Sequence, residues 1–181
     1  DFGISQLWGE RPHIYRQFRY DGTPLQGHNG VDFLTPAGTP LQAVDDGVVA
    51  EAGHDPTGFG LYVLLHHSWG ESIYAHMGHL DVKSGQSVKQ AQSLGQSGNT
   101  GNSDGPHLHF AIRTIPYART AGWGGYSDPL PYLPRAQVLL PYYVLPPEQR
   151  PPLPQGAPAP ATLSDPAAPG MEPDQPGVRR P

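Results

Sequence analysis

Three short segments of this 181-residue chain carry side chains that bind metals or transfer protons. The first is Gly27-His28-Asn29-Gly30-Val31-Asp32-Phe33, in which a His and an Asp stand four residues apart around a glycine. Imidazole and carboxylate groups are ligands of zinc. The flanking Val31 and Phe33 favour a turn that enters a strand, so the two side chains converge if Gly30 lets the backbone bend.

The second segment, residues 105–113, alternates in the manner of a β-strand. On such a strand His107 and His109 share one face with Ala111 and Arg113, over an apolar face made by Leu108, Phe110 and Ile112. The two imidazoles then project side by side from a rigid support, as a metal centre requires.

The third segment is Tyr74-Ala75-His76, where strand alternation predicts that Tyr74 and His76 share a face and that Ala75 points away. Only the fold can bring this segment to the other two. Local spacing therefore leaves two readings open: a metal site, or histidines with ordinary structural roles.

The composition restricts the chemistry further. The chain has no Cys, so a metal has to be held by His, Asp, Glu or carbonyl oxygen. A formal charge of −5 with scattered Lys and Arg argues against nucleic acid as a partner. No segment approaches the ~20 apolar residues of a transmembrane helix, and no signal peptide is visible after Asp1, so we expect any leader to have been removed or to lie on a longer parent.

The elements that must position these side chains are short strands, because Gly, Pro, Asn and Asp interrupt the first 144 residues every eight to twelve positions. The sequence predicts an all-β fold of antiparallel sheets, sandwich-like, with long loops that form a groove, and a short helix at Pro12–Phe18. The predicted strands are Thr39–Ala43, Gly47–Ala52, Leu61–His66, Glu71–His76, Ser87–Gln90, Ser93–Gln96 and His107–Arg113.

We expect one domain over residues 1–144, with a core at about 22–133, followed by a tail. Residues 145–181 include 12 Pro and have no hydrophobic periodicity, which predicts a disordered tail or linker.

With these residues in view, the sequence resembles the lysostaphin/LytM-type zinc metalloendopeptidases of peptidoglycan. The resemblance runs from about Gly9 to Leu133. It includes the first segment, then Pro36-Ala37-Gly38-Thr39-Pro40, Asp46-Gly47, Tyr74-Ala75-His76, Gly85-Gln86-Ser87-Val88, Thr100-Gly101 and Gly105-Pro106-His107-Leu108-His109-Phe110, in the family's order.

The resemblance implies one Zn²⁺ per chain, bound by His28, Asp32 and His109, with His76 and His107 as the catalytic histidines. Three protein ligands leave the open position that a catalytic zinc needs. The implied reaction is hydrolysis of peptide bonds in peptidoglycan cross-links by a metal-activated water. One histidine would transfer protons and the other would stabilise the oxyanion, and the sequence does not say which does which.

Two other functions are also compatible with the sequence. The first is a cell-wall-binding or activator module of the same fold without hydrolysis, and the second is a structural zinc protein with His107 as a fourth ligand. We expect a monomer that acts outside the cell or in the bacterial envelope, or a phage-associated lysin.

The loop before the second segment is predicted to form one wall of the groove. From it and from the metal-bearing strand we predict four substrate contacts: Asn99, Thr100, Asp104 and Arg113. The five other histidines are expected to have surface or structural roles: His13, His54, His66, His67 and His79.

Overall fold

The computed structural model describes residues 3–134 and 139–141, all within a compact unit that spans residues 1–141. The predicted Pro-rich tail, 145–181, lies outside the described residues. The described part is almost entirely β-structure, with one four-residue helix, α1 (Pro12–Tyr15), and one 3₁₀ turn, η1 (Leu130–Tyr132). The strands are β1 (Ile4–Gln6), β2 (Arg19–Tyr20), β3 (Thr23–Pro24), β4 (Val31–Phe33), β5 (Pro40–Gln42), β6 (Gly47–Asp55), β7 (Gly60–His67), β8 (Gly70–Leu80), β9 (Ser87–Val88), β10 (Ser93–Ser97) and β11 (Leu108–Thr114).

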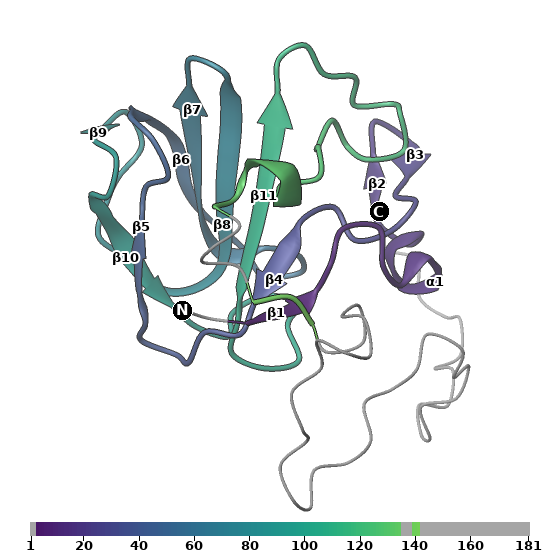
Figure 1. Cartoon of the computed structure of the whole chain (residues 1–181), viewed down its shortest axis with the longest axis horizontal. Coiled ribbons are helices and arrows are strands. Elements are labelled where there is room, and N and C mark those ends of the chain that lie inside the picture. Colours follow the sequence, from purple (N-terminus) through teal and green to yellow (C-terminus); the bar gives the residue numbers. More distant parts are fainter. Residues whose placement is uncertain (1–2, 135–138, 142–181) are drawn as a thin grey trace, which may run out of the picture. The chain divides into compact units, whose positions relative to one another are not determined.

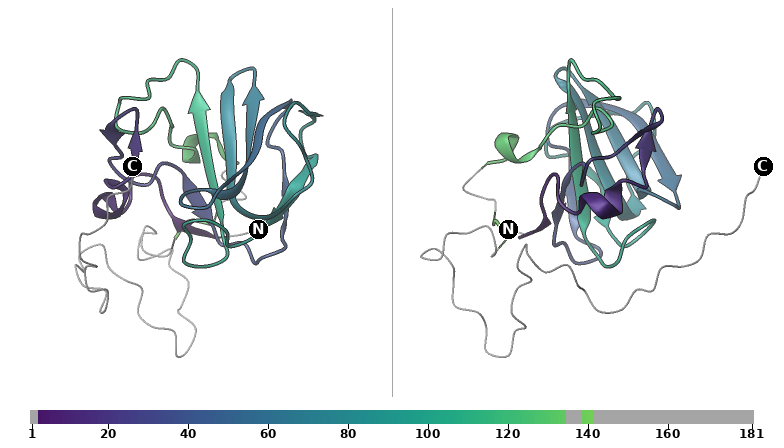
Figure 2. Two further views of the ribbon diagram at one scale, coloured as in Figure 1. Left: turned by 180° about the vertical axis from the view of Figure 1, so that it is seen from behind. Right: turned by 90° about the vertical axis from the view of Figure 1, so that its right-hand side faces the viewer.

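One antiparallel sheet holds most of these strands, in the order β1-β4-β11-β8-β7-β6-β9. Strand β10 pairs with β8 and also with β5, so these two strands branch from the sheet. Figure 1 shows β7, β8 and β11 side by side, and in Figure 2 the β2–β3 hairpin and the loop 115–129 lie next to each other in both views. The antiparallel all-β fold predicted from the sequence is confirmed.

Strand alternation divides the apolar residues between the two faces of this sheet. One face packs against residues of β5, β9 and β10 and forms the larger core, which includes Tyr74, Phe110 and Leu94. The other face carries Ile73, Ala75 and Ala111 under Tyr126. Since His109 precedes Phe110 and points away from the larger core, it projects on the second face, which is where the polar site forms.

The sequence located every strand of five or more residues in the described part of the chain, and two of the six shorter ones, β5 and β9. All seven predicted strands are present with shifted ends, and β8 extends four residues beyond its predicted end at His76. Strands β1, β2, β3 and β4 were not among the predicted strands, and the helix ends at Tyr15 and not at Phe18. The four missed strands have only two or three residues each, too few to show an alternating pattern. None of the helices among the described residues is long and apolar enough to span a membrane.

One prediction about side-chain direction is wrong. Tyr74 and His76 do not share a face: Tyr74 is in the larger core, where its hydroxyl accepts a hydrogen bond from the Val44 amide, while His76 lies beside His107 and His109. The register explains the difference, because Leu61 pairs with Met77 but Val63 pairs with Tyr74. One residue of β7 thus opposes two of β8, a β-bulge at Ala75 and His76 that reverses the expected direction of His76.

Candidate metal centre

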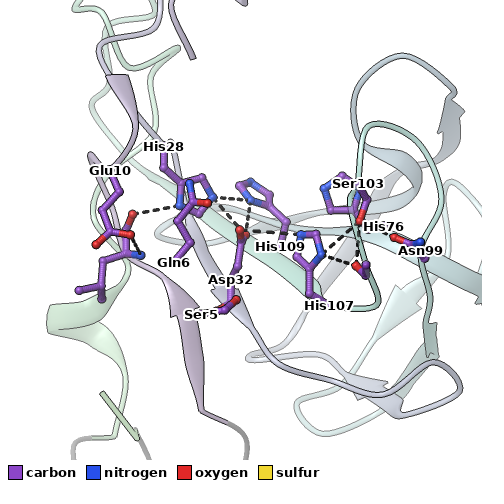
Figure 3. A network of polar contacts seen from close by, with 12 residues as sticks. Ser5, Gln6, Glu10, His28, Asp32, His76, Asn99, Ser103, His107 and His109 are labelled. Atoms are coloured by element: carbon purple, nitrogen blue, oxygen red, sulfur yellow. Dashed lines mark hydrogen bonds and ion pairs between the residues drawn. The ribbon is translucent and has the colours of Figure 1, made fainter. Parts of the chain in front are cut away.

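The strands β4 and β11 bring the first and second segments together. Their register pairs Asp32 with His109, and β11 in turn pairs His109 with Ala75 of β8. Asp32 and His109 are therefore direct neighbours across two strands, with side chains on the same face. His28 precedes β4 by a tight turn and reaches the same point, as Figure 3 shows.

Three atoms converge there: His28 Nε2, His109 Nδ1 and Asp32 Oδ1. The two imidazole nitrogens are 2.9 Å apart, and the carboxylate oxygen is 3.1 Å from His28 Nε2 and 2.9 Å from His109 Nδ1. All three residues are buried. In a tetrahedral zinc site with bonds of about 2.0 Å, ligand atoms lie about 3.3 Å from one another, so this triangle has nearly the size that one ion requires.

Proton positions also favour a cation at this point. His28 Nδ1 lies 3.0 Å from the carbonyl oxygen of Leu7, which can only accept, so the neutral His28 ring carries its proton on Nδ1 and presents a lone pair at Nε2. Burial by itself raises the pKa of Asp32, but the hydrogen bond from His109 and the close contact with His28 outweigh it and hold the pKa well below its usual range. The lone pairs of His28 Nε2 and Asp32 Oδ1 therefore face each other at 3.1 Å. The neutral His109 ring has only one proton to place between them.

The ring of His109 has one nitrogen at the cluster and one without a partner. Burial lowers the pKa of His109, so the ring is neutral near pH 7 and carries one proton. Its Nε2 is buried and has no hydrogen-bond partner among the described residues. A metal at Nδ1 would move that proton to Nε2 and leave three lone pairs directed at the ion, so the donor set fits a divalent cation such as zinc.

Gly30 is needed for a different reason from the one predicted. It is not among the glycines with a positive φ. A Cβ at this position would lie 2.6 Å from the Phe110 carbonyl oxygen and 2.7 Å from Cε1 of His109. The glycine therefore gives β4 room to approach β11, and this approach brings Asp32 and His28 to His109.

His107 and His76 lie next to this triangle. His107 Nε2 is 3.8 Å from Asp32 Oδ2, and the ring centroids of His76 and His107 are 4.6 Å apart. Each ring places Nδ1 on a backbone carbonyl of the same loop, His76 on Thr100 and His107 on Gly105, both at 2.8 Å. Both rings therefore carry the proton on Nδ1 when neutral and have a lone pair at Nε2.

The loop that supplies these carbonyls is closed at its base by a bridge between Gly98 and His107. Burial, together with the neighbouring His109, lowers the pKa of His76 to about 4. The neutral form of His76 is consequently the one present near pH 7, and it can accept a proton at Nε2.

The four predicted substrate contacts are separated by the structure. Asn99 and Asp104 are exposed on this loop, and Asn99 accepts a hydrogen bond from Ser103. Thr100 has its hydroxyl bonded to β7 and β8. Arg113 is buried, forms an ion pair with Glu71 at 2.8 Å and lies 4.1 Å from the centre of the Tyr126 ring, so the structure does not bring it to the triangle. Contact of any of the four with a substrate stays a prediction.

The sequence patterns missed the contribution of the N-terminal segment. Besides the bond from His28 Nδ1 to Leu7, the amide of His28 donates to the Glu10 carbonyl and its carbonyl accepts from Gly9. Strand β1 pairs with β4, with Gln6 opposite Asp32. No residue type in positions 4–10 signals this role, because backbone atoms perform it.

Gly27→Ala is expected to lower zinc affinity about 10- to 100-fold, the range found when the groups that orient metal ligands are disturbed. A Cβ on Gly27 would overlap the backbone of Gly9 and push the N-terminal segment away from His28. The measurement is a competition titration with a zinc-binding dye. Gly3→Ala is the matched control, since a Cβ there meets its neighbours at ordinary distances of 3.9 and 4.0 Å, and equal affinities of the two variants would contradict the prediction.

Curated proteins are similar in sequence to parts of this chain. The glycyl-glycine endopeptidase ALE-1 of Staphylococcus capitis is 38% identical over 112 residues, which cover 59% of this chain and 29% of that protein. The peptidoglycan DD-endopeptidase ShyA of Vibrio cholerae is 41% identical over 85 residues, 47% of this chain and 20% of that protein. This chain thus spans less than a third of the length of these curated relatives.

Among solved structures, the catalytic domain of lysostaphin from Staphylococcus simulans is similar with a TM-score of 0.59 and 31% identity, over 72% of this chain and 91% of that domain. The model of peptidase family M23 matches residues 26–122, more than half of the chain, and this range contains the metal triangle, both neighbouring histidines and the loop that orients them. The chain therefore belongs to peptidase family M23.

Proposed function

We propose that this protein is a zinc-dependent endopeptidase that hydrolyses peptide bonds in the cross-links of bacterial peptidoglycan, with one Zn²⁺ per chain. His28 Nε2, Asp32 Oδ1 and His109 Nδ1 would hold the ion. The observation that carries the proposal is the buried triangle of these three atoms with two further imidazoles, of His76 and His107, beside it. A zinc ion there would supply a Lewis acid that activates water and polarises the scissile carbonyl.

The residues of this chain would do the rest of the chemistry. His76 and His107 have their Nδ1–H groups held by carbonyls, so each offers Nε2 to a proton. One of them takes a proton from the attacking water and returns it to the leaving amine, and the other, once protonated, donates a hydrogen bond to the developing oxyanion. The exposed Asn99 and Asp104 on the loop beside them are proposed to contact the peptide.

The names of the relatives support peptidoglycan peptides as the substrate class, but they do not agree on which peptide bond is cut. ALE-1 is named a glycyl-glycine endopeptidase and ShyA a peptidoglycan DD-endopeptidase. The name of ShyA refers to peptidoglycan, and on this basis we propose that this protein acts outside the cell or in the envelope.

The alternative is a module of the same fold that binds or activates without hydrolysis. Nothing in the site favours it, because the three proposed metal ligands and the two proposed catalytic histidines are all present. A structural zinc would need a fourth protein ligand, and His107 Nε2, at 3.8 Å from Asp32, lies beside the triangle.

The proposal is tested by elemental analysis and by digestion of defined wall peptides followed by mass spectrometry. The set of wall peptides should include glycyl-glycine and DD-linked peptides. We expect about one zinc per chain and new amino termini at one type of cross-link. Zinc-loaded protein that sediments with cell walls but releases no amino groups would support the binding module instead.

A further inference from the structure

The histidine that differs most from its predicted position, His76, has the most unusual backbone in the site. It has φ = 59°, in the left-handed region that non-glycine residues seldom adopt. This conformation belongs to the β-bulge in β8 and turns the ring toward His107 and His109. Such strain persists when surrounding contacts hold it in place, so the contacts around the bulge determine where the imidazole lies.

Thr100 supplies most of these contacts although it is 24 residues away in sequence. Its hydroxyl donates to the Met77 carbonyl at 2.7 Å and accepts from the Leu61 amide at 2.8 Å. Leu61 and Met77 are the register pair that closes the bulge. The hydroxyl therefore bridges the two strands at the residue that follows His76.

The main chain of Thr100 acts on His76 itself. Its carbonyl oxygen lies 2.8 Å from His76 Nδ1, which fixes the ring tautomer and orientation. The loop and the β6–β7 turn are packed backbone to backbone, since a Cβ on Gly60 would overlap the backbone of Thr100 and one on Gly101 would overlap that of Gly60. The amide of His76 donates to the Phe59 carbonyl in the same turn, at 2.8 Å.

We propose that Thr100 is a positioning residue for His76: its hydroxyl holds the bulge and its carbonyl holds the imidazole, so that Nε2 faces the metal triangle. This assigns Thr100 a different role from the substrate contact expected from the sequence. A half-buried hydroxyl that already donates one hydrogen bond and accepts another is poorly placed to recognise a substrate. The kinetic consequences rest on the proposed function, but the geometric claim does not.

The experiment replaces Thr100 by Val, which keeps the shape and removes the hydroxyl. Imidazole ¹⁵N shifts of His76 in the full-length protein report the tautomer and the hydrogen bond at Nδ1, and they need no substrate. We expect these shifts to change in Thr100→Val. We expect kcat on wall peptides to fall about 10- to 100-fold, with KM within about 2-fold and zinc content unchanged, because an interaction that orients a catalytic group acts on the transition state. Thr100→Ser, which restores the hydroxyl, should recover most of kcat.

A pair of glycine variants tests the backbone contact independently. Gly60 and Gly85 both have positive φ, 65° and 84°, so Ala costs strain at either position. A Cβ on Gly60 overlaps Thr100, whereas nothing lies within 4 Å of one on Gly85. Gly60→Ala should reproduce the loss of kcat and the change at His76, and Gly85→Ala should show neither.

Three results would overturn the proposal. Unchanged His76 shifts in Thr100→Val would show that the hydroxyl does not position the ring. A rise in KM with constant kcat would make Thr100 a substrate contact. Failure of both Thr100→Val and Gly60→Ala to fold would make the loop a requirement of the fold and not of His76. If the unmodified protein cleaves no wall peptide, the proposed function fails while the His76 shifts still decide the role of Thr100.

Discussion

Replacement of His107 by Ala is expected to lower the hydrolysis of wall peptides by about 10²- to 10⁴-fold, the usual contribution of a general acid or base. His107 is outside the triangle, its Nδ1 is held by the Gly105 carbonyl, and its Nε2 faces the carboxylate of Asp32. The imidazole also contacts the Ser103 hydroxyl and the His76 ring, but it is not one of the three residues of the triangle, so we expect the variant to fold and keep its zinc. The loss should therefore appear in turnover and not in metal content.

The control is His79→Ala, which removes an exposed imidazole paired with Asp81 on the surface. It should have the activity and zinc content of the unmodified protein. Full activity of His107→Ala would exclude the mechanism as proposed. Loss of zinc in His107→Ala would instead make His107 a ligand and favour the structural-zinc alternative.

Asp32→Asn is expected to lower zinc affinity by at least about 100-fold. Disturbing a group that only orients a metal ligand lowers affinity by up to about 100-fold, and replacing a ligand itself should cost at least as much. Asp32 Oδ1 is in contact with both histidines of the triangle, and Asn would replace an anionic donor by a neutral amide. With zinc at 100 times the dissociation constant, binding stabilises the unmodified protein by about 2.7 kcal/mol. A 100-fold weaker site would retain about 0.4 kcal/mol of this at the same zinc concentration.

The readout has to be the difference in unfolding free energy with and without zinc. The pKa of Asp32 is held below its ordinary value in the folded protein, so its carboxylate stabilises the fold above the pKa of the unfolded chain, and this stability is lost as the pH falls through the folded pKa. At neutral pH the zinc-free variant is therefore expected to be less stable as well. Asp81→Asn is the matched control, because it removes a carboxylate that faces a histidine at 3.3 Å on the surface. A zinc-induced stabilisation of Asp32→Asn equal to that of Asp81→Asn would rule out Asp32 as a ligand.

The β11 segment shows how much local pattern can establish. Its alternation correctly put His109 on one face and Phe110 and Ile112 on the other, because the strand is long, regular and paired on both sides. The same rule failed at His76, four residues from the end of β8, because it assumes a regular register. A bulge adds one residue to a strand and reverses the direction of the side chains that follow.

The candidate site was predicted from His28, Asp32 and the pair His107 and His109, whose types and spacing are visible in the sequence, and the order of motifs added His76. Residue types fix which atoms can bind a metal or carry a proton, and alternation fixes which of them share a strand face. The sequence alone determined this much, together with the antiparallel β-class and the absence of thiolate ligands.

The tertiary structure decided which nitrogen of each imidazole faces the centre. Backbone carbonyls of Leu7, Thr100 and Gly105 orient His28, His76 and His107, and every residue has a carbonyl, so no residue type marks these three. It also showed that Gly30 provides room and not a bend, and that the Thr100 hydroxyl bridges β7 and β8 beside the bulge at His76. The physical reason is the same in each case: chain segments far apart in sequence meet through backbone atoms, and their positions depend on the register of the whole sheet.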